Sequence, residues 1–188
     1  MSLTQQLEDS WVKEIFTTEE LKQYATFESE MKSASAEQKA NFEKDWFKFV
    51  EEVENNLDQD PRSAKGIVMG RKFMEFVNAL YGKKYAHLRT KKFEKWFGEG
   101  KGLEQHGLTP EIVSWIEEAM DVYWHDRLYS VLAQVDQESP TKLLVMWNEV
   151  MDDMYGEEER KTAIPKLAYN DPKVSPAAKQ WLKATFKL

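Results

Sequence analysis

The chain of 188 residues contains no cysteine, which excludes disulfides, thiolate metal sites and thiol nucleophiles together. It also has no surplus of positive charge: its formal net charge is −7, and its basic residues alternate with acids or aromatics. Because phosphate binding needs a basic face, we expect no nucleic-acid partner. No apolar run approaches the ~18 residues of a membrane span, and the first residues form no positive-then-apolar signal segment. We therefore expect a cytoplasmic protein with no membrane partner.

Enzyme motifs are missing as well. The sequence has no G-x-S-x-G, P-loop or G-x-G-x-x-G pattern. His87, His106 and His125 stand in no E-x-x-H or H-E-x-x-H pattern, so di-iron and zinc ligand sets are missing. His125 and Asp126 are adjacent, and on a helix their side chains diverge instead of forming a dyad. We expect no enzyme activity, no metal and no cofactor. A hydrolase that uses His87 or His125 with nearby carboxylates remains an alternative.

Aromatic residues and methionines are plentiful for so hydrophilic a chain, with 7 Trp, 7 Tyr, 10 Phe and 8 Met. Beneath an acidic surface they can fill a helical core. They can equally line a pocket for flat, apolar ligands.

Apolar residues recur at i, i+3 and i+4 along most of the chain, which predicts an all-α fold. "FTTEEL" offers a capping box between Thr17 and Glu20, and Thr109 followed by Pro110 is a second good helix start. The spacing predicts helices over 18–31, 36–57, 62–81, 84–97, 110–135 and 140–155, a helical stretch around 164–167, and a last helix that starts at Ser175-Pro176.

Two stretches, "GLTPEIVSWIEEAM" (107–120) and "VSPAAKQWLKAT" (174–185), share a hydroxyl residue, Pro, four residues and Trp. Further matches occur in the same order along the chain. The pairs are Trp46 with Trp124 and Asp58-Gln59 with Asp136-Gln137 (offset 78), Phe73 with Trp147 and Tyr81-Gly82 with Tyr155-Gly156 (offset 74), and Thr109-Pro110 and Trp115 with Ser175-Pro176 and Trp181 (offset 66). This order indicates a degenerate duplication.

The duplication predicts two parts that share the long helix 110–135. Residues 1–120 form the first module together with the N-terminal helices, and residues 121–188 form a partial second repeat. Two such units would pack as one compact body with a cleft between them. Its expected lining residues are aromatic: Phe73, Tyr81, Trp96, Trp115, Trp124, Trp147 and Tyr155. Each of them could instead be a core residue.

Several of these motifs, namely "FTTEEL", "WFKFVEEV", the Asp-Pro turn and "HGLTPEIVSWIEEAM", resemble the TipAS-type antibiotic-recognition domain. That domain forms the effector half of certain MerR-family regulators and also stands alone in albicidin-binding resistance proteins. The first copy, roughly 16–120, follows the family order throughout. The second, about 121–188, matches only the later part and has no entry like "FTTEEL".

The resemblance implies a globin-like helical bundle that sequesters a bulky aromatic or peptide-like small molecule. No basic helix-turn-helix precedes the domain, so we do not expect a complete DNA-binding regulator. Thiopeptide-binding members capture their ligand through a cysteine, and this chain would have to bind without a covalent bond. The ligand itself is not inherited with the fold.

Two functional classes therefore stay open: a drug-like ligand binder, and a protein-interaction or accessory domain whose aromatic residues are all core. The sequence is compatible with a monomer or a dimer.

Overall fold

The computed structural model describes residues 12–156 and 158–188, and all regular structure within them is helical, which confirms the all-α prediction. Its helices are α2 (Thr18–Lys32), α3 (Ala36–Glu54), α4 (Ala64–Tyr81), α5 (Ala86–Lys92), the π-helical η1 (Phe93–Phe97), the 3₁₀ turn η2 (Glu104–His106), α6 (Pro110–Leu132), α7 (Pro140–Met154), α8 (Glu158–Asn170) and α9 (Pro176–Phe186). Within these described ranges, every helix is too short or too polar to span a lipid bilayer.

Short-range capping signals set where the helices begin. Thr17 and Glu20 form the expected capping box at the start of α2, with Thr17 Oγ1 accepting from the Glu20 backbone N–H at 3.3 Å. Thr109 accepts from the N–H of Ile112 at 3.2 Å, and Pro110 occupies the first position of α6. Because these contacts reach only three residues along the chain, the sequence alone predicts them.

Helix ends differ more from the expectation. The segment expected as one helix over 84–97 changes after Lys92 into the π-helical turn η1. The Gly98 N–H donates to the carbonyl of Phe93 at 2.9 Å, which closes this wider turn. The helix expected over 110–135 ends at Leu132, and the one expected over 36–57 ends at Glu54.

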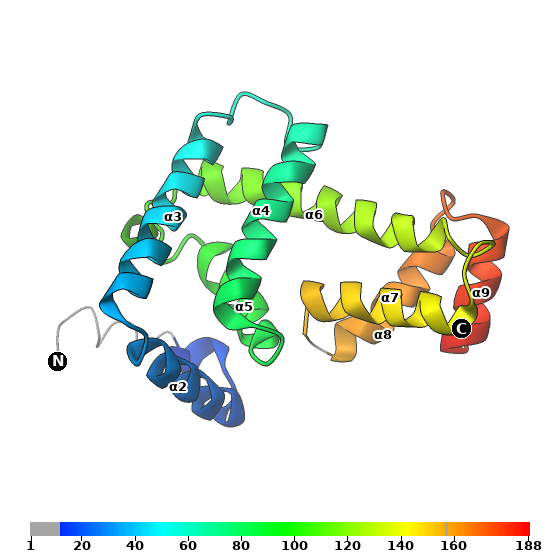
Figure 1. Ribbon diagram of the computed structural model, residues 1–188, viewed down its shortest axis with the longest axis horizontal. Helices are drawn as coiled ribbons and strands as arrows, with labels where there is room; N and C mark the ends of the chain where they lie inside the picture. Colours follow the sequence, from blue (N-terminus) through cyan, green and yellow to red (C-terminus); the bar gives the residue numbers. More distant parts are fainter. Residues whose placement is uncertain (1–11, 157) are drawn as a thin grey trace.

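The long helix α6 joins the two ends of the molecule (Figure 1). Helices α3 and α4 pack against it on the side of its N-terminus, and α7 packs against it toward its C-terminus. Helices α8 and α9 pack on each other beyond α7. The predicted boundary at residue 120 therefore falls inside one continuous helix.

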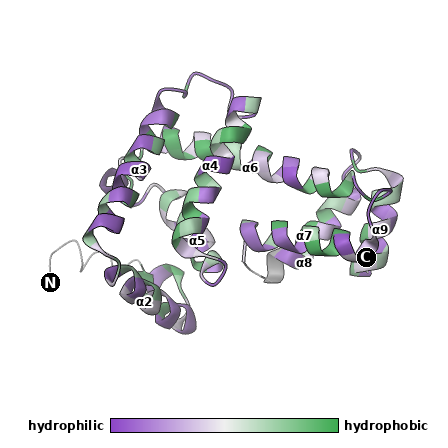
Figure 2. Ribbon diagram, in the orientation of Figure 1, coloured by the Kyte–Doolittle hydropathy of each residue, from purple (hydrophilic) through white to green (hydrophobic). Residues whose placement is uncertain are grey.

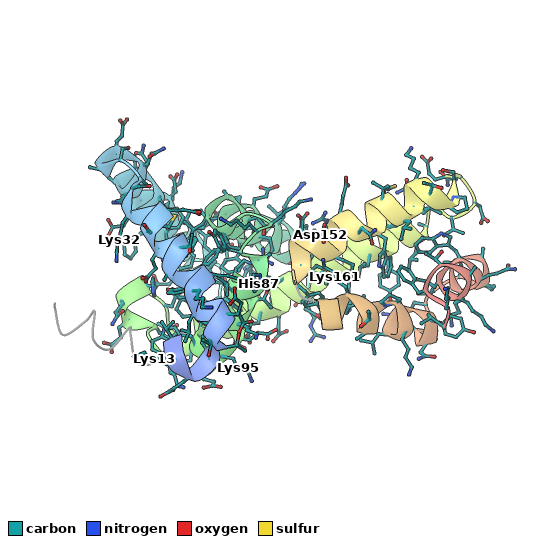
Figure 3. The ribbon with its side chains drawn as sticks, turned by 90° about the horizontal axis from the view of Figure 1, so that it is seen from below. Lys13, Lys32, His87, Lys95, Asp152 and Lys161 are labelled. Carbon is teal, nitrogen blue, oxygen red and sulfur yellow. The ribbon has the colours of Figure 1, made fainter. Side chains whose placement is uncertain are left out.

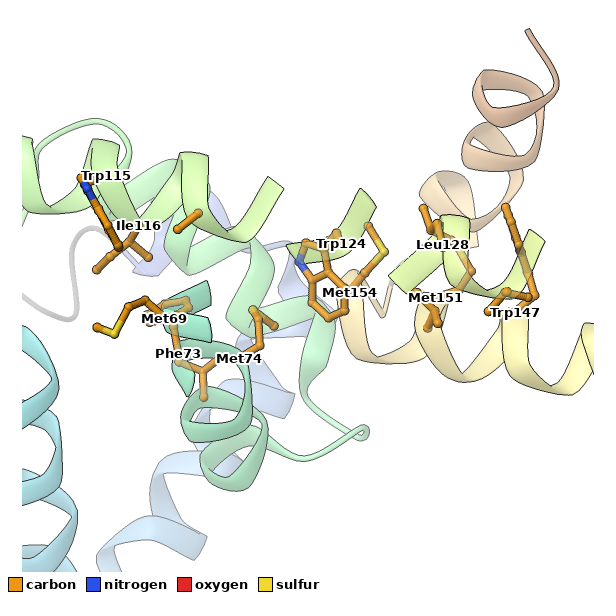
Figure 4. Close-up of a cluster of buried hydrophobic side chains, with 14 of the residues drawn as sticks. Met69, Phe73, Met74, Trp115, Ile116, Trp124, Leu128, Trp147, Met151 and Met154 are labelled. Carbon is orange, nitrogen blue, oxygen red and sulfur yellow. The ribbon is translucent and has the colours of Figure 1, made fainter. Parts of the chain in front are cut away.

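One apolar cluster follows α6 along its length and takes in residues from α3 to α9. Figure 4 shows Trp115 and Ile116 above Met69 of α4, and Leu128 farther along near Met151 of α7. Figure 2 shows green apolar segments alternating with purple hydrophilic ones along the helices. A second cluster joins α2 to α4 and α5, where Phe27 stacks on Tyr81 with ring centroids 4.5 Å apart.

The closest helix pair, α4 and α6, depends on a glycine. A Cβ atom at Gly70 would lie 2.5 Å from the carbonyl oxygen of Ala119, so only glycine lets the two backbones approach this closely. The predicted repeat would match Gly70 of α4 with Leu144 of α7. The second half therefore lacks the residue that makes this crossing possible.

We expect Gly70→Ala to lower the free energy of unfolding by about 1–3 kcal/mol, even though alanine is the better helix former, because the clash involves backbone atoms that cannot rotate away. Urea denaturation measures the change. Val68→Ala on the same helix is the control, since Val68 is 47% exposed and an exposed truncation should change stability by less than about 0.5 kcal/mol. Unchanged stability of Gly70→Ala would contradict the close crossing.

Candidate functional site

A pocket of about 540 Å³ lies among α3, α4, the α5–η1 segment, α6 and the C-terminal end of α7. Its size matches that of small-molecule sites, which commonly span about 300–1,000 Å³. Aromatic and other apolar side chains predominate in its lining. They are Phe42, Trp46, Phe47, Phe73, Met74, Phe76, Val77, Leu80, Tyr81, Phe93, Phe97, Met120, Trp124, Met154 and Tyr155.

Neighbouring rings form a continuous aromatic wall on the α3–α4 side of the pocket. Phe76 lies with its ring centroid 4.4 Å from that of Phe42 and 5.5 Å from that of Trp46. The Trp46 indole N–H donates to the carbonyl of His106 at 2.8 Å, which fixes the ring plane. A tryptophan anchored at its polar atom leaves its apolar face available for stacking.

The π-helical turn η1 supplies the adjoining part of the wall. Phe93 contacts Phe73 with centroids 5.4 Å apart, and Phe97 meets Phe93 edge-on at 6.1 Å. Both phenylalanines line the pocket. Single π turns inside helices are frequent at functional sites, because the extra residue per turn redirects side chains.

Helix α6 presents one face to the pocket. Glu117, Met120, Asp121 and Trp124 all line it and follow the i, i+3, i+4, i+7 spacing of a single helical face. The face is mixed, with one buried indole, one adaptable thioether and two carboxylates. This mixture explains why the apolar pattern of α6 alone does not reveal a pocket here.

Burial changes the titration of two groups at the pocket. Removal from water, with a smaller contribution from the nearby Lys92 charge, lowers the pKa of His106 to about 4, so its imidazole is neutral at pH 7. Burial, and then repulsion from Glu94, raises the pKa of Glu117 above its ordinary value. The Glu94 carboxylate therefore lies close enough to disfavour the charged form of Glu117.

Arg89 connects the first half of the chain to the second. Its guanidinium is buried and donates to the carbonyls of Asp153 at 2.8 Å and Met154 at 2.7 Å, and also to the Asn78 side chain. These carbonyls belong to the last turn of α7, where intrahelical donors are missing and the helix dipole favours a cation. Burial lowers the pKa of Arg89 to about 10, so it stays charged at pH 7.

Further contacts reinforce this junction between α5 and the C-terminal end of α7. The Thr90 hydroxyl donates to the carbonyl of Tyr155, 3.1 Å away. Gly156 adopts a φ of +66°, and a Cβ there would lie 2.6 Å from Cβ of Ala86. Just beyond, Asp152 of α7 forms an ion pair with Lys161 of α8 at 2.7 Å (Figure 3). The junction holds Tyr155 and its neighbour Met154 at the edge of the pocket.

The structure brings together four of the seven residues predicted to bind a ligand. Phe73, Tyr81, Trp124 and Tyr155 line the pocket, and Figure 4 shows Trp124 beside Met154. The other three predicted residues, Trp96, Trp115 and Trp147, do not line it.

Each of these three tryptophans has its own surroundings. The Trp115 indole donates to the carbonyl of Gln59 at 2.9 Å. Trp147 is fully buried and packs edge-on against Trp181. Trp96 packs against Gly102. A Cβ atom at Gly102 would lie 2.1 Å from the indole nitrogen of Trp96.

Sequence reasoning did not name Trp46, Phe76, Phe93, Phe97 or His106 as candidates. For Trp46 a signal was present, because the repeat matches it to Trp124, which was named. No comparable signal exists for the others, since Phe76 on α4, the π turn η1 and the 3₁₀ turn η2 that carries His106 come together only in three dimensions.

A second hollow of about 770 Å³ lies where residues of α4, α6 and α7 meet. It contains the ion pair between Arg127 and Asp153, whose atoms are 3.0 Å apart. Tyr123 is the one aromatic residue among its described lining residues. Its mixed and charged walls make it a weaker candidate for an apolar ligand than the aromatic pocket.

Comparison of the chain with protein-family models, curated proteins and solved structures finds no match. Within residues 12–156 and 158–188, no cluster of three or more histidine, aspartate or glutamate side chains is placed to hold a metal ion.

We expect Arg89→Met to lower the free energy of unfolding by about 3 kcal/mol, because it leaves buried carbonyls without donors. Chemical denaturation gives the change. The control is Arg71→Met, since Arg71 is exposed and forms an ion pair with Glu75 one turn away, where such a pair contributes about 0.5 kcal/mol or less. Equal effects of the two substitutions would refute a structural role for the junction.

A pH dependence follows from His106. The unfolded chain protonates this imidazole near its ordinary pKa of 6.5, whereas the folded chain resists protonation down to about 4. Its contribution to stability is thus complete above pH 6.5 and is lost as the pH falls from 6.5 toward 4.

We expect His106→Gln to lose less stability than the unmodified protein between pH 7 and pH 4.5. Urea denaturation of both proteins at the two pH values measures the difference, and carboxylate titrations common to both cancel. Parallel losses in the two proteins would argue against a buried, neutral imidazole.

Proposed function

We propose that the protein binds a bulky, aromatic or peptide-like small molecule in the pocket among α3, α4, η1 and α6. The observation that carries the proposal is the density of aromatic rings around one cavity of ligand size. Rings present large contact areas at a small entropic cost, which suits stacking on planar groups. Met120 and Met154 add adaptable apolar contacts.

The arrangement of charges and nucleophiles at the pocket favours binding over catalysis. Arg89 is bound to backbone carbonyls, and the imidazole of His106 lies edge-on against Phe97 with centroids 5.2 Å apart. Neither group is placed to activate a nucleophile. The role that fits is sequestration of the ligand without a covalent bond, since the chain has no cysteine.

The resemblance to the TipAS-type domain supports the same role, and with it a globin-like bundle built from a tandem repeat. In line with the repeat, the two halves place matched residues at matched points: Trp115 and Trp181 each stand five residues after the proline that begins α6 or α9. Gly82 and Gly156, which follow the matched tyrosines, both have a positive φ.

The second candidate function is a protein-interaction or accessory domain. The observation that favours it is a set of exposed apolar side chains: Phe47, Val68, Val145 and Leu167. Phe47, however, also lines the pocket. A partner that covers these residues without entering the pocket would distinguish this function from ligand binding.

Tryptophan fluorescence can test the first proposal. Nile red, a neutral aromatic dye, should bind and accept energy from Trp46 and Trp124, and Met120→Trp should block it by filling the pocket. We expect this variant to reduce affinity at least about tenfold, equivalent to about 1.4 kcal/mol. The matched control is Val145→Trp, which adds the same side chain at an exposed site on α7.

Equal dye binding by the two variants would show that the dye sits elsewhere. Absence of binding by the unmodified protein, for Nile red and for a panel of aromatic antibiotics in a thermal-shift assay, would remove the proposal. It would then favour the interaction domain.

A further inference from the structure

We infer that the pocket selects ligands that carry a positive charge, so that its natural ligand is a hydrophobic aromatic cation. This inference rests on the proposed function and adds the charge of the ligand to it. Two features support it. Aromatic rings line the pocket, and, among the residues that the structure describes, the basic side chains at the pocket are bonded within the protein whereas Glu43 and Glu117 are not.

Two of the acidic groups at the pocket, Glu43 and Glu117, are available to a ligand. Glu94, Glu117 and Asp121 line it from η1 and α6, and Glu43 lines it from α3. Within the described part of the chain, Glu43 and Glu117 make no hydrogen bond or ion pair. Asp121 has only His125 beside it, with 3.9 Å between Nδ1 and the carboxylate oxygen.

The basic groups at the pocket are engaged by the protein. The Arg89 guanidinium donates hydrogen bonds to the carbonyls of Asp153 and Met154 and to the Asn78 side chain. Lys92 is hydrogen-bonded to the hydroxyl of Tyr24, in the cluster that packs α2 on the domain. Among the described residues that line the pocket, an anionic ligand would thus meet carboxylates and no free cation.

Glu117 is the group at which a ligand cation would gain most. Its carboxylate lies next to Gly98, so that a Cβ there would be 3.4 Å from Oε1, and it lies near Glu94. A ligand cation beside Glu117 would offset the repulsion that Glu94 exerts on its carboxylate.

The aromatic wall points to the same ligand class independently. Ring faces carry negative charge density and attract cations within about 6 Å, with a gain of up to about 2 kcal/mol when water is excluded. The chain already uses this contact nearby, where the Arg127 guanidinium lies 5.2 Å from the ring centroid of Trp124. Rings and carboxylates together match a cation whose charge is embedded in an apolar frame.

Tetraphenylphosphonium and tetraphenylborate test the inference, because they share one shape and carry opposite charges. Isothermal titration in sodium buffer at 150 mM salt should show that the unmodified protein prefers the phosphonium at least about tenfold, or about 1.4 kcal/mol. Glu117→Gln combined with Asp121→Asn should reduce this preference about fivefold or more by weakening the phosphonium.

The control is Asp136→Asn combined with Glu149→Gln. It makes the same change in net charge at exposed positions away from the pocket. We expect it to leave the preference within about twofold of the original, because salt screens distant surface charges.

Nile red separates the two proposals. If the dye binds and Met120→Trp blocks it, yet the two ions bind equally or the borate binds better, the cation inference is overturned and the proposed function stands. If neither the dye nor either ion binds, both fail. An equal loss of preference in the two double variants would also overturn the inference, since the effect would then come from net charge alone.

Discussion

The bonds from Arg89 to the end of α7 are the constraint on which the pocket depends. Helix α6 connects the two ends of the molecule, and α7 packs against it toward its C-terminus. The buried guanidinium also ties the end of α7 to α5, because it donates to the last α7 carbonyls. Met154 and Tyr155 are thereby held where they complete a wall otherwise built by the first half.

A second constraint, the α4–α6 crossing, fixes the opposite side of the pocket. Gly70 lets α4 lie directly on α6, and this contact aligns Phe73, Phe76 and Val77 with the pocket face of α6. A tight crossing on one side and the buried hydrogen bonds of Arg89 on the other leave space between them that the side chains do not fill. The proposed ligand site is a consequence of that geometry.

The sequence predicted what depends on neighbouring residues and missed what depends on distant ones. Caps at Thr17 and Thr109 act over three residues, so the predicted starts of α2 and α6 were correct. Periodicity also shows that Trp124 and Trp147 face inward. It does not show that one borders a cavity while the other packs on Trp181, since that depends on which helices cross. Likewise, Arg89 looks like any surface arginine until α7 is placed beside it.

The claim that one cavity receives an aromatic ligand is tested most directly by a crystal structure of the protein soaked with a bromine-labelled aromatic dye. Bromine can be located by anomalous scattering without reference to the surrounding atoms. The account predicts a peak between Trp46, Phe93 and Trp124. Peaks confined to the outer surface, or side chains that close the cavity in the crystal, would contradict it.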